Sequence, residues 1–239
     1  MLNTILFDLD GTLLPFVQEE FIRAYFKALL SRLIPMGYDG EKVSAALWKG
    51  TMAMIGNDGS RTNRQVFWEL FTQELGVQAL ALESNLEDFY IHEFDGVRSV
   101  LRQQVDRRPV IDALKAKGYG LVLATNPVFP AVAVETRLKW AGLCSEDFAY
   151  ITTYENSRHS KPNPDYYRDI LTHIGRRPEE CLMIGNNPVD DMAALAVGLE
   201  GFLVTDYLEN PNNTPIDAYK KGTFQELEAC LAALPAVEG

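Results

Sequence analysis

The stretch ILFDLDGTLL, residues 5–14, combines a run of strand-forming apolar residues with two carboxylates, Asp8 and Asp10. A strand this apolar is typical of a sheet that is buried on both faces. Because side chains alternate along an extended chain, Asp8 and Asp10 are expected to point to the same side, with Cα atoms about 6.5 Å apart. The pattern predicts a buried strand that runs to Asp10 and carries two acids at its carboxyl end.

Paired carboxylates at a strand end are suited to catalysis. Two like charges this close disfavour ionisation of both groups unless a cation lies between them. One carboxylate can then act as a nucleophile, while a carboxyl of raised pKa can act first as general acid and then as base. Oxygen-rich sites also suit Mg²⁺, which takes one or two carboxylates and completes its shell with phosphate oxygens and water.

Two simpler interpretations of the same residues compete with a catalytic site. An EF-hand calcium loop starting at Asp8 would have Glu19 at its twelfth position, but its sixth position, which requires glycine, is Leu13. A plain turn that uses Asp and Gly for their backbone tolerance is commoner. The four residues DLDG alone therefore do not separate a turn from a site.

The composition describes an acidic globular protein. The chain has 239 residues, 47% of them hydrophobic, and a formal net charge of −11. This charge argues against nucleic acid or an anionic membrane as partner, since both require clustered Lys and Arg. Cys144, Cys181 and Cys230 are expected to be reduced thiols, and no basic segment precedes an apolar run near Met1. We expect a cytoplasmic protein that is neither exported nor inserted into a membrane.

The pattern of apolar residues divides the chain into two parts. From Phe16 to about Glu93 the apolar residues have helical spacing, and Thr62 with Gln65 and Ser84 with Glu87 are typical of capping boxes that open two helices. After Val97 strand-like runs alternate with helical stretches, the runs being YGLVLAT, FAYITT, CLMIG and GFLVT. Such alternation predicts a Rossmann-like α/β core with a parallel sheet. We expect residues 1–14 and 98–239 to form this core and residues 15–97 to form a smaller, all-helical cap domain.

Polar residues follow several of the predicted strands. Ligands of parallel sheets bind beyond the carboxyl ends of the strands. The residues there are Asp8 and Asp10 after the first strand, Thr125 and Asn126 after LVLA, and GNNPVDD, residues 185–191, after CLMI. Lys161 lies shortly before Asn163 and Pro164, which are typical of a helix N-cap and first helical position.

These motifs, in this order, resemble those of the haloacid dehalogenase superfamily, in particular its members with a helical cap inserted directly after the first motif. The resemblance covers almost the whole chain. It implies that Asp8 is the nucleophile that forms an aspartyl-phosphate and that Asp10 is the acid and base. It also implies that Thr125, Asn126 and Lys161 bind phosphate, and that Mg²⁺ is held by Asp8, Asp10, Asn186 and either Asp190 or Asp191. A small phosphorylated metabolite is the expected partner, and the oligomeric state is open.

One position departs from the pattern of the superfamily. Its members usually begin the fourth motif with Gly-Asp, whereas Asn186 stands here, and the count to Gly198 slightly favours Asp190 over Asp191 as the second acid. Asparagine brings no charge to a metal, so a non-catalytic relative that binds a phosphorylated ligand or a protein partner is the alternative. Related dehalogenases lack the second Asp of the first motif, so Asp10 favours simple phosphomonoester hydrolysis.

The cap contains one polar, glycine-rich loop, GNDGSRTN, residues 56–63. It is either an ordinary turn or an element that faces the phosphate site. In the second case Arg61, with Asn63 beside it, is the candidate to hold another anionic group of the substrate, because a guanidinium can bind phosphate through two hydrogen bonds.

Overall fold

The computed structural model describes residues 1–76, 79 and 82–237. It contains a six-stranded parallel sheet with the strand order β3-β2-β1-β4-β5-β6. The strands are β1 (Thr4–Phe7), β2 (Gly120–Leu123), β3 (Tyr150–Ile151), β4 (Cys181–Gly185), β5 (Glu200–Val204) and β6 (Lys221–Gly222). The sheet and the helices around it confirm the predicted Rossmann-like α/β class.

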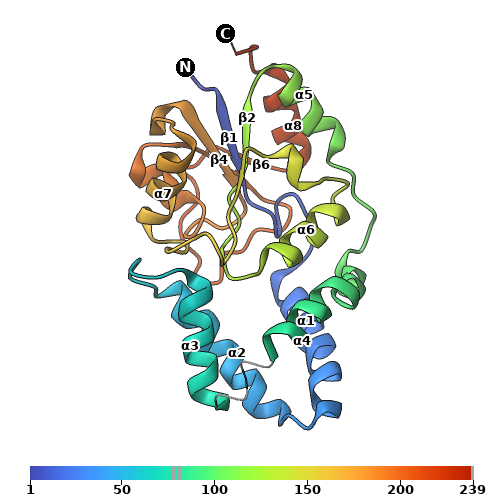
Figure 1. Cartoon of the computed structure of the whole chain (residues 1–239). Helices are drawn as coiled ribbons and strands as arrows, with labels where there is room; N and C mark the ends of the chain where they lie inside the picture. The colour runs from blue at the N-terminus through green and yellow to red at the C-terminus, as the bar shows by residue number, and fades with distance from the viewer. Residues whose placement is uncertain (77–78, 80–81, 238–239) are drawn as a thin grey trace.

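Helices cover both faces of the sheet. They are α5 (Arg108–Ala116), α6 (Ala131–Trp140), α7 (Pro164–Ile174) and α8 (Phe224–Ala233). Alternation along β1 explains the two layers, because Ile5 and Phe7 pack in one apolar cluster with α5 and α8, while Leu6 packs in the other with α7. Figure 1 shows α7 on one side of the sheet and α5 and α8 on the other.

The described part of the chain between β1 and α5 contains helices and loops. The helices are α1 (Gln18–Leu33), α2 (Gly40–Ile55), α3 (Asn63–Leu75), α4 (Leu82–His92) and two short 3₁₀ helices, Ile34–Met36 and Phe94–Val100. These helices lie below the sheet in Figure 1, on the side away from both chain termini. The exact limits of a cap domain stay a prediction, since the second 3₁₀ helix continues past residue 97.

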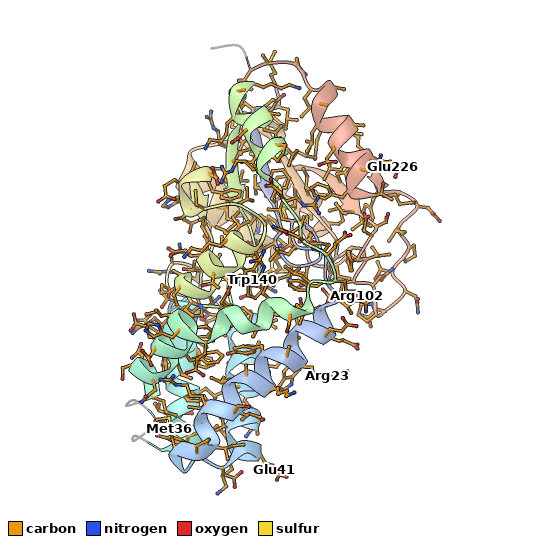
Figure 2. The ribbon with its side chains drawn as sticks, turned by 90° about the vertical axis from the view of Figure 1, so that its right-hand side faces the viewer. Arg23, Met36, Glu41, Arg102, Trp140 and Glu226 are labelled. Carbon is orange, nitrogen blue, oxygen red and sulfur yellow. The ribbon has the colours of Figure 1, made fainter. Side chains whose placement is uncertain are left out.

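Aromatic packing joins the helical segment to the core. Phe94 stacks on Trp140 of α6 with ring centroids 5.5 Å apart, and the Trp140 indole donates a hydrogen bond of 2.8 Å to Asp95. Trp140 lies at this junction in the view of Figure 2. The junction fixes α6 between the sheet and the helices.

Helix starts were predicted with mixed success. The capping box of Thr62 and Gln65 opens α3, and the Asn163 side chain accepts from the Asp165 amide at the start of α7, as predicted. Ser84 lies inside α4, so the prediction that it opens a helix is wrong. The first strand is also shorter than predicted, because β1 ends at Phe7 and the chain turns through Gly11 at φ 76°.

Candidate active site

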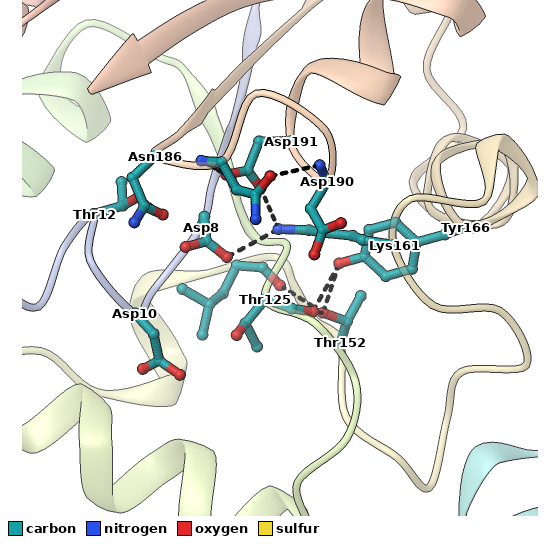
Figure 3. Close-up of polar contacts among 12 residues, drawn as sticks. Asp8, Asp10, Thr12, Thr125, Thr152, Lys161, Tyr166, Asn186, Asp190 and Asp191 are labelled. Carbon is teal, nitrogen blue, oxygen red and sulfur yellow. Dashed lines mark hydrogen bonds and ion pairs between the residues drawn. The ribbon is translucent and has the colours of Figure 1, made fainter. Parts of the chain in front are cut away.

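Asp8 lies at the carboxyl end of the central strand β1. Its amide donates to the carbonyl of Ile184 in β4 at 2.8 Å, so its backbone is held by the sheet itself. The Lys161 ammonium donates to Asp8 Oδ1 at 2.8 Å and to Asp191 Oδ1 at 2.6 Å (Figure 3). Lys161 is only 2% exposed, so the structure fixes one positive charge between two acids.

Burial dominates the electrostatics of this group. It raises the pKa of Asp8 to about 7, against the attraction of Lys161, and Asp191 and Asp10 add repulsion in the same direction. Burial alone would lower the pKa of Lys161, but its attraction to Asp191 and Asp8 raises that pKa well above the usual value. The lysine is therefore a fixed cation, and Asp8 remains short of positive charge.

Asp10 faces a different partner from Asp8. In Figure 3 it lies on the side of Asp8 away from Lys161. Its Oδ2 accepts from the guanidinium of Arg137, a completely buried side chain of α6 that lies 4.5 Å from the centre of the Phe129 ring. Burial raises the pKa of Asp10, and Arg137 opposes the rise. Asp10 Oδ1 is buried without a hydrogen-bond partner among the described residues, so Arg137 satisfies only one of the two oxygens of this carboxyl.

The prediction that Asp8 and Asp10 share one face of a strand was wrong in its geometry. The strand ends before Asp8, and the turn at Gly11 sets the direction of the following residues. A Cβ at Gly11 would lie 2.1 Å from Asn186 Nδ2, so only glycine allows this turn to pack against the loop after β4. The two acids are nevertheless close enough for Asp10 to raise the pKa of Asp8.

Asn186 follows β4 and is buried in a set of hydrogen bonds. Its Nδ2 donates to the carbonyl of Tyr207 at 2.6 Å, and its Oδ1 accepts from the Thr12 hydroxyl at 3.3 Å. Its carbonyl accepts from the amide of Glu209 at 3.0 Å. The asparagine thus ties the loop after β5 to the loop after β1, a role for which a carboxylate would lack the donor.

Asp190 and Asp191 occupy different surroundings. Asp191 is buried, and its Oδ2 accepts from the Asn187 amide at 2.8 Å while Oδ1 accepts from Lys161. Asp190 lines the cavity described below, and burial raises its pKa. Asp191 therefore anchors the lysine, and Asp190 is the one of the two that faces the cavity.

Thr125 and Asn126 follow β2, next to Asp8. The Thr125 carbonyl accepts from Tyr166 Oη at 2.8 Å and from Thr152 Oγ1 at 2.7 Å, which fixes the backbone after β2 (Figure 3). Both Thr125 and Asn126 line the cavity, and Asn126 Oδ1 is buried without a partner among the described residues. This edge therefore offers a hydroxyl and an amide beside the Asp8–Lys161 pair.

The donor set of this site suits Mg²⁺. No group of three or more His, Cys, Asp or Glu side chains in the described part of the chain forms a metal cluster by itself. Mg²⁺ however needs only one or two carboxylates with other oxygens and water. Burial raises the pKa of Asp8, Asp10 and Asp190, so the positive charge of Lys161 and Arg137 does not fully compensate these carboxyls. Asp8, Asn186 Oδ1 and Asp190 are the residues that would hold the ion.

A cavity of about 600 Å³ opens above these residues. The loops after β1, β2 and β4 form one end, and the helices α1 to α4 supply most of the other. Asp8, Asp10, Thr125, Asn126, Lys161, Asn186 and Asp190 all line it. These residues lie up to 182 positions apart in the sequence, from Asp8 to Asp190. The fold brings them together around one cavity.

The two cap residues singled out from the sequence lie elsewhere. Arg61 is not among the described residues that line the cavity, and its guanidinium pairs with Glu69 at the surface. Asn63 is fully buried, and its Nδ2 donates to the carbonyl of Pro127 and to Ser160 Oγ, both at 3.0 Å. The prediction that Arg61 and Asn63 contact substrate is therefore corrected: the first is a surface ion pair and the second joins α3 to the core.

Three residues of the site were missed. Arg137 lies on the apolar face of α6 with Val134 and Leu138, and a charge at such a position is the signal that was overlooked. Glu209 lines the cavity after β5, where burial raises its pKa, and its place after the strand-like run GFLVT is the signal that could have identified it. Arg64, not Arg61, is the cap arginine that faces the cavity.

Comparison with known proteins agrees with this arrangement. The model of the haloacid dehalogenase-like hydrolases matches residues 2–198. The pyrophosphatase PpaX of Bacillus cereus (strain AH820) is 27% identical over 219 residues, which cover 92% of this chain and 89% of the relative.

Two solved structures share the fold. The 2-haloacid dehalogenase of Pseudomonas syringae pv. Tomato DC3000 has a TM-score of 0.60 at 19% identity, covering 97% of this chain and 99% of its own. The HAD-hydrolase YfnB of Bacillus subtilis, described as bound to magnesium, has a TM-score of 0.58 at 21% identity, covering 96% and 98%. On the family match, the chain belongs to the haloacid dehalogenase-like hydrolases.

Proposed function

We propose that this hydrolase is a Mg²⁺-dependent phosphatase that cleaves a small phosphorylated metabolite through an aspartyl-phosphate. The observation that carries the proposal is the placement of Asp8 at the base of the cavity, beside the buried Lys161 and two residues before Asp10. Phosphoryl transfer depends mainly on positioning and on neutralising charge. The site supplies a nucleophile, a fixed cation and an acid within one cavity.

In the first step an Asp8 carboxylate oxygen attacks phosphorus, and the bond from phosphorus to the leaving oxygen breaks. Lys161 keeps Asp8 oriented and offsets the charge of the transferring group. Asp10, which lines the cavity and is held by Arg137, gives a proton to the leaving oxygen. The products are the free alcohol and phosphorylated Asp8.

In the second step Asp10, now ionised, takes a proton from water. The resulting oxygen attacks phosphorus, the bond from phosphorus to Asp8 breaks, and inorganic phosphate is released with Asp8 restored. Mg²⁺, when bound, supplies positive charge to the phosphate oxygens. The magnesium-bound relative YfnB supports this cofactor, and the pyrophosphatase relatives support phosphate chemistry.

A non-catalytic relative is the second candidate. The observation that favours it is Asn186, whose amide is committed to Tyr207 and whose Oδ1 already accepts from Thr12. A protein of this kind would bind a phosphorylated ligand or a protein partner without turnover.

One experiment separates the two candidates. Purified protein is mixed with p-nitrophenyl phosphate and Mg²⁺, and both phosphate release and the acid-quenched peptide that contains Asp8 are analysed. We expect steady release by the natural protein and accumulation of phosphorylated peptide in Asp10→Asn, in which the second step lacks its base. Binding of substrate without release, and without any phosphorylated peptide, would favour the non-catalytic candidate.

A further inference from the structure

We propose that the cavity selects phosphate monoesters whose alcohol portion is an apolar ring system without negative charge, and that it rejects inorganic pyrophosphate. This proposal rests on the proposed function, because it assigns the leaving group of the same reaction. What supports it is the set of side chains that line the cavity beyond the end proposed to bind phosphate.

Each of the four helices of the cap segment turns one face to the cavity. Ile22, Tyr25 and Phe26 of α1 have helical spacing, as have Leu47, Trp48 and Ile55 of α2. In all, eight aromatic side chains are among the described residues of the lining. Cavities of about 300 to 1,000 Å³ with such walls enclose drug-sized organic ligands. The space is therefore suited to an organic ring rather than to a second phosphate.

The polar atoms of these aromatic walls are largely paired with one another. Tyr25 and Tyr90 share a hydrogen bond of 2.6 Å between their hydroxyls, and Trp68 Nε1 donates to Tyr154 Oη at 3.5 Å. Burial raises the pKa of Tyr25 to about 12, so its hydroxyl stays neutral. The walls consequently present ring faces and offer few donors to an anion.

The charge of the cavity opposes a second anionic group. Of the described residues that line it, eight are acidic and two, Arg64 and Lys161, are basic. Lys161 already bridges Asp8 and Asp191, and Arg64 pairs with Glu83. Glu87, Glu135 and Glu155 lie at the exposed part of the lining, and none of them has an ion pair within the described ranges. Pyrophosphate would meet these carboxylates where it needs cations.

The test compares leaving groups in the natural protein with Mg²⁺. We expect kcat/KM for 2-naphthyl phosphate, after correction for its better leaving group, to exceed that for methyl phosphate by about a hundredfold, as burial of a naphthyl ring predicts. The kcat/KM for phenyl phosphate should be about fivefold higher than that for 4-carboxyphenyl phosphate, which carries one more negative charge. Pyrophosphate should be hydrolysed at least about a hundredfold less well than 2-naphthyl phosphate.

Two pairs of variants locate the effect. Trp48→Ala, which removes a half-exposed ring of the wall, should lower the preference for naphthyl over methyl phosphate by about tenfold. Ile91→Ala in α4, also exposed but outside the lining, should leave that ratio unchanged. Glu135→Gln should reduce the discrimination against 4-carboxyphenyl phosphate, whereas Glu179→Gln, a surface change outside the lining, should not.

A binding measurement keeps the proposal separate from catalysis. Calorimetry with 2-naphthylmethylphosphonate, methylphosphonate and methylenediphosphonate reports the preference of the cavity without turnover. Tighter binding of the naphthyl compound supports the inference, even if no ester is hydrolysed and the proposed function fails. Preference for methylenediphosphonate or for pyrophosphate overturns the inference, while hydrolysis of simple monoesters would still support the proposed function.

Discussion

The two ends of the cavity are built by different means. At the end that we propose to bind phosphate, here called the phosphate end, hydrogen bonds at fixed distances hold Asp8, Lys161 and Asn186 in the loops around the sheet edge. At the other end, helix faces supply rings whose polar atoms pair with each other. The first end accumulates charge that burial makes costly, and the second is apolar. On the proposed function, the comparison teaches that this fold separates the chemistry, set by the sheet edge, from the choice of leaving group, set by the helices.

The largest effect should come from Asp8→Asn, which removes the nucleophile. Turnover should fall by at least about a thousandfold, as for other covalent catalysts. The stability of the metal-free protein should rise rather than fall in this variant. The pKa of Asp8 is raised to about 7, so the folded state holds a proton that the unfolded state loses near pH 4, and stability falls as pH rises between these values.

The Asn variant should therefore be more stable than the natural protein above pH 7 and similar to it at pH 4. Thermal unfolding across this range checks the expectation. Asp217→Asn, at a fully exposed position, is the control. Loss of stability in Asp8→Asn at pH 8 would contradict the view that the phosphate end is short of positive charge.

Arg137→Met should have the next largest effect. The change leaves the Asp10 carboxylate buried without its partner, which typically costs about 3 kcal/mol of unfolding free energy. Burial raises the pKa of Asp10 and Arg137 opposes the rise, so removing Arg137 should raise this pKa further, and the cost should be smaller at pH 5 than at pH 8 because low pH favours the neutral carboxyl. Urea unfolding at both pH values measures it.

Arg137→Lys, which keeps a positive charge, should recover part of the loss. Arg168→Met breaks an exposed ion pair with Asp165 and should cost less than about 1 kcal/mol. An equal loss of unfolding free energy in Arg137→Met at both pH values would mean that the packing of the Arg137 side chain, not its charge, stabilises the protein.

Magnesium should stabilise the natural protein in a pH-dependent way. At one hundred times its Kd, a ligand of the folded state adds about 2.7 kcal/mol. Protons compete for carboxyls whose pKa is raised, as it is for Asp8 and Asp190, so the gain should be clear at pH 8 and small at pH 5. Differential scanning calorimetry with MgCl₂, against NaCl at equal ionic strength, provides the measurement. The same gain with both salts would exclude a specific ion site.

The smallest effect is expected from Asn186→Asp. A carboxylate would add an anionic ligand and should lower the Mg²⁺ concentration for half-maximal activity by about threefold to tenfold. It would also lose the donor to the Tyr207 carbonyl, at a cost of about 1 kcal/mol without metal. Titration of activity and of melting temperature with Mg²⁺ separates these effects. An unchanged midpoint would mean that Asn186 does not touch the ion.

Much of the sheet was predictable because buried parallel strands have continuous apolar runs. The runs around Leu121, Leu182 and Leu203 became β2, β4 and β5, and polar residues that follow β2 and β4 line one cavity. The two-residue strand β6, Lys221–Gly222, has no apolar run to reveal it. This strand forms because it pairs with β5, and the local sequence pattern holds no information about that pairing.

Two features of the site depend on tertiary contacts that no spacing reveals. Arg61 lies just before α3 and Arg64 lies in its first turn, and only packing decides that Arg64 turns to the cavity. The apolar residues of α1 also differ in what they contact. Phe21 is core, as its spacing indicates, but the adjacent Ile22 lines the cavity. Helical periodicity identifies an apolar face without saying whether protein or substrate covers it.

Asn63 limits how the helical segment can move. Its amide holds α3 against the loop after β2 and against Ser160, whose hydroxyl in turn donates to the Met54 carbonyl at 2.9 Å. The helical segment is thus fastened to the core at a point far in sequence from both of its chain connections. A full swing of these helices away from the sheet would have to break these buried hydrogen bonds, so on the proposed function substrate would enter and product would leave through smaller movements that keep α3 in place.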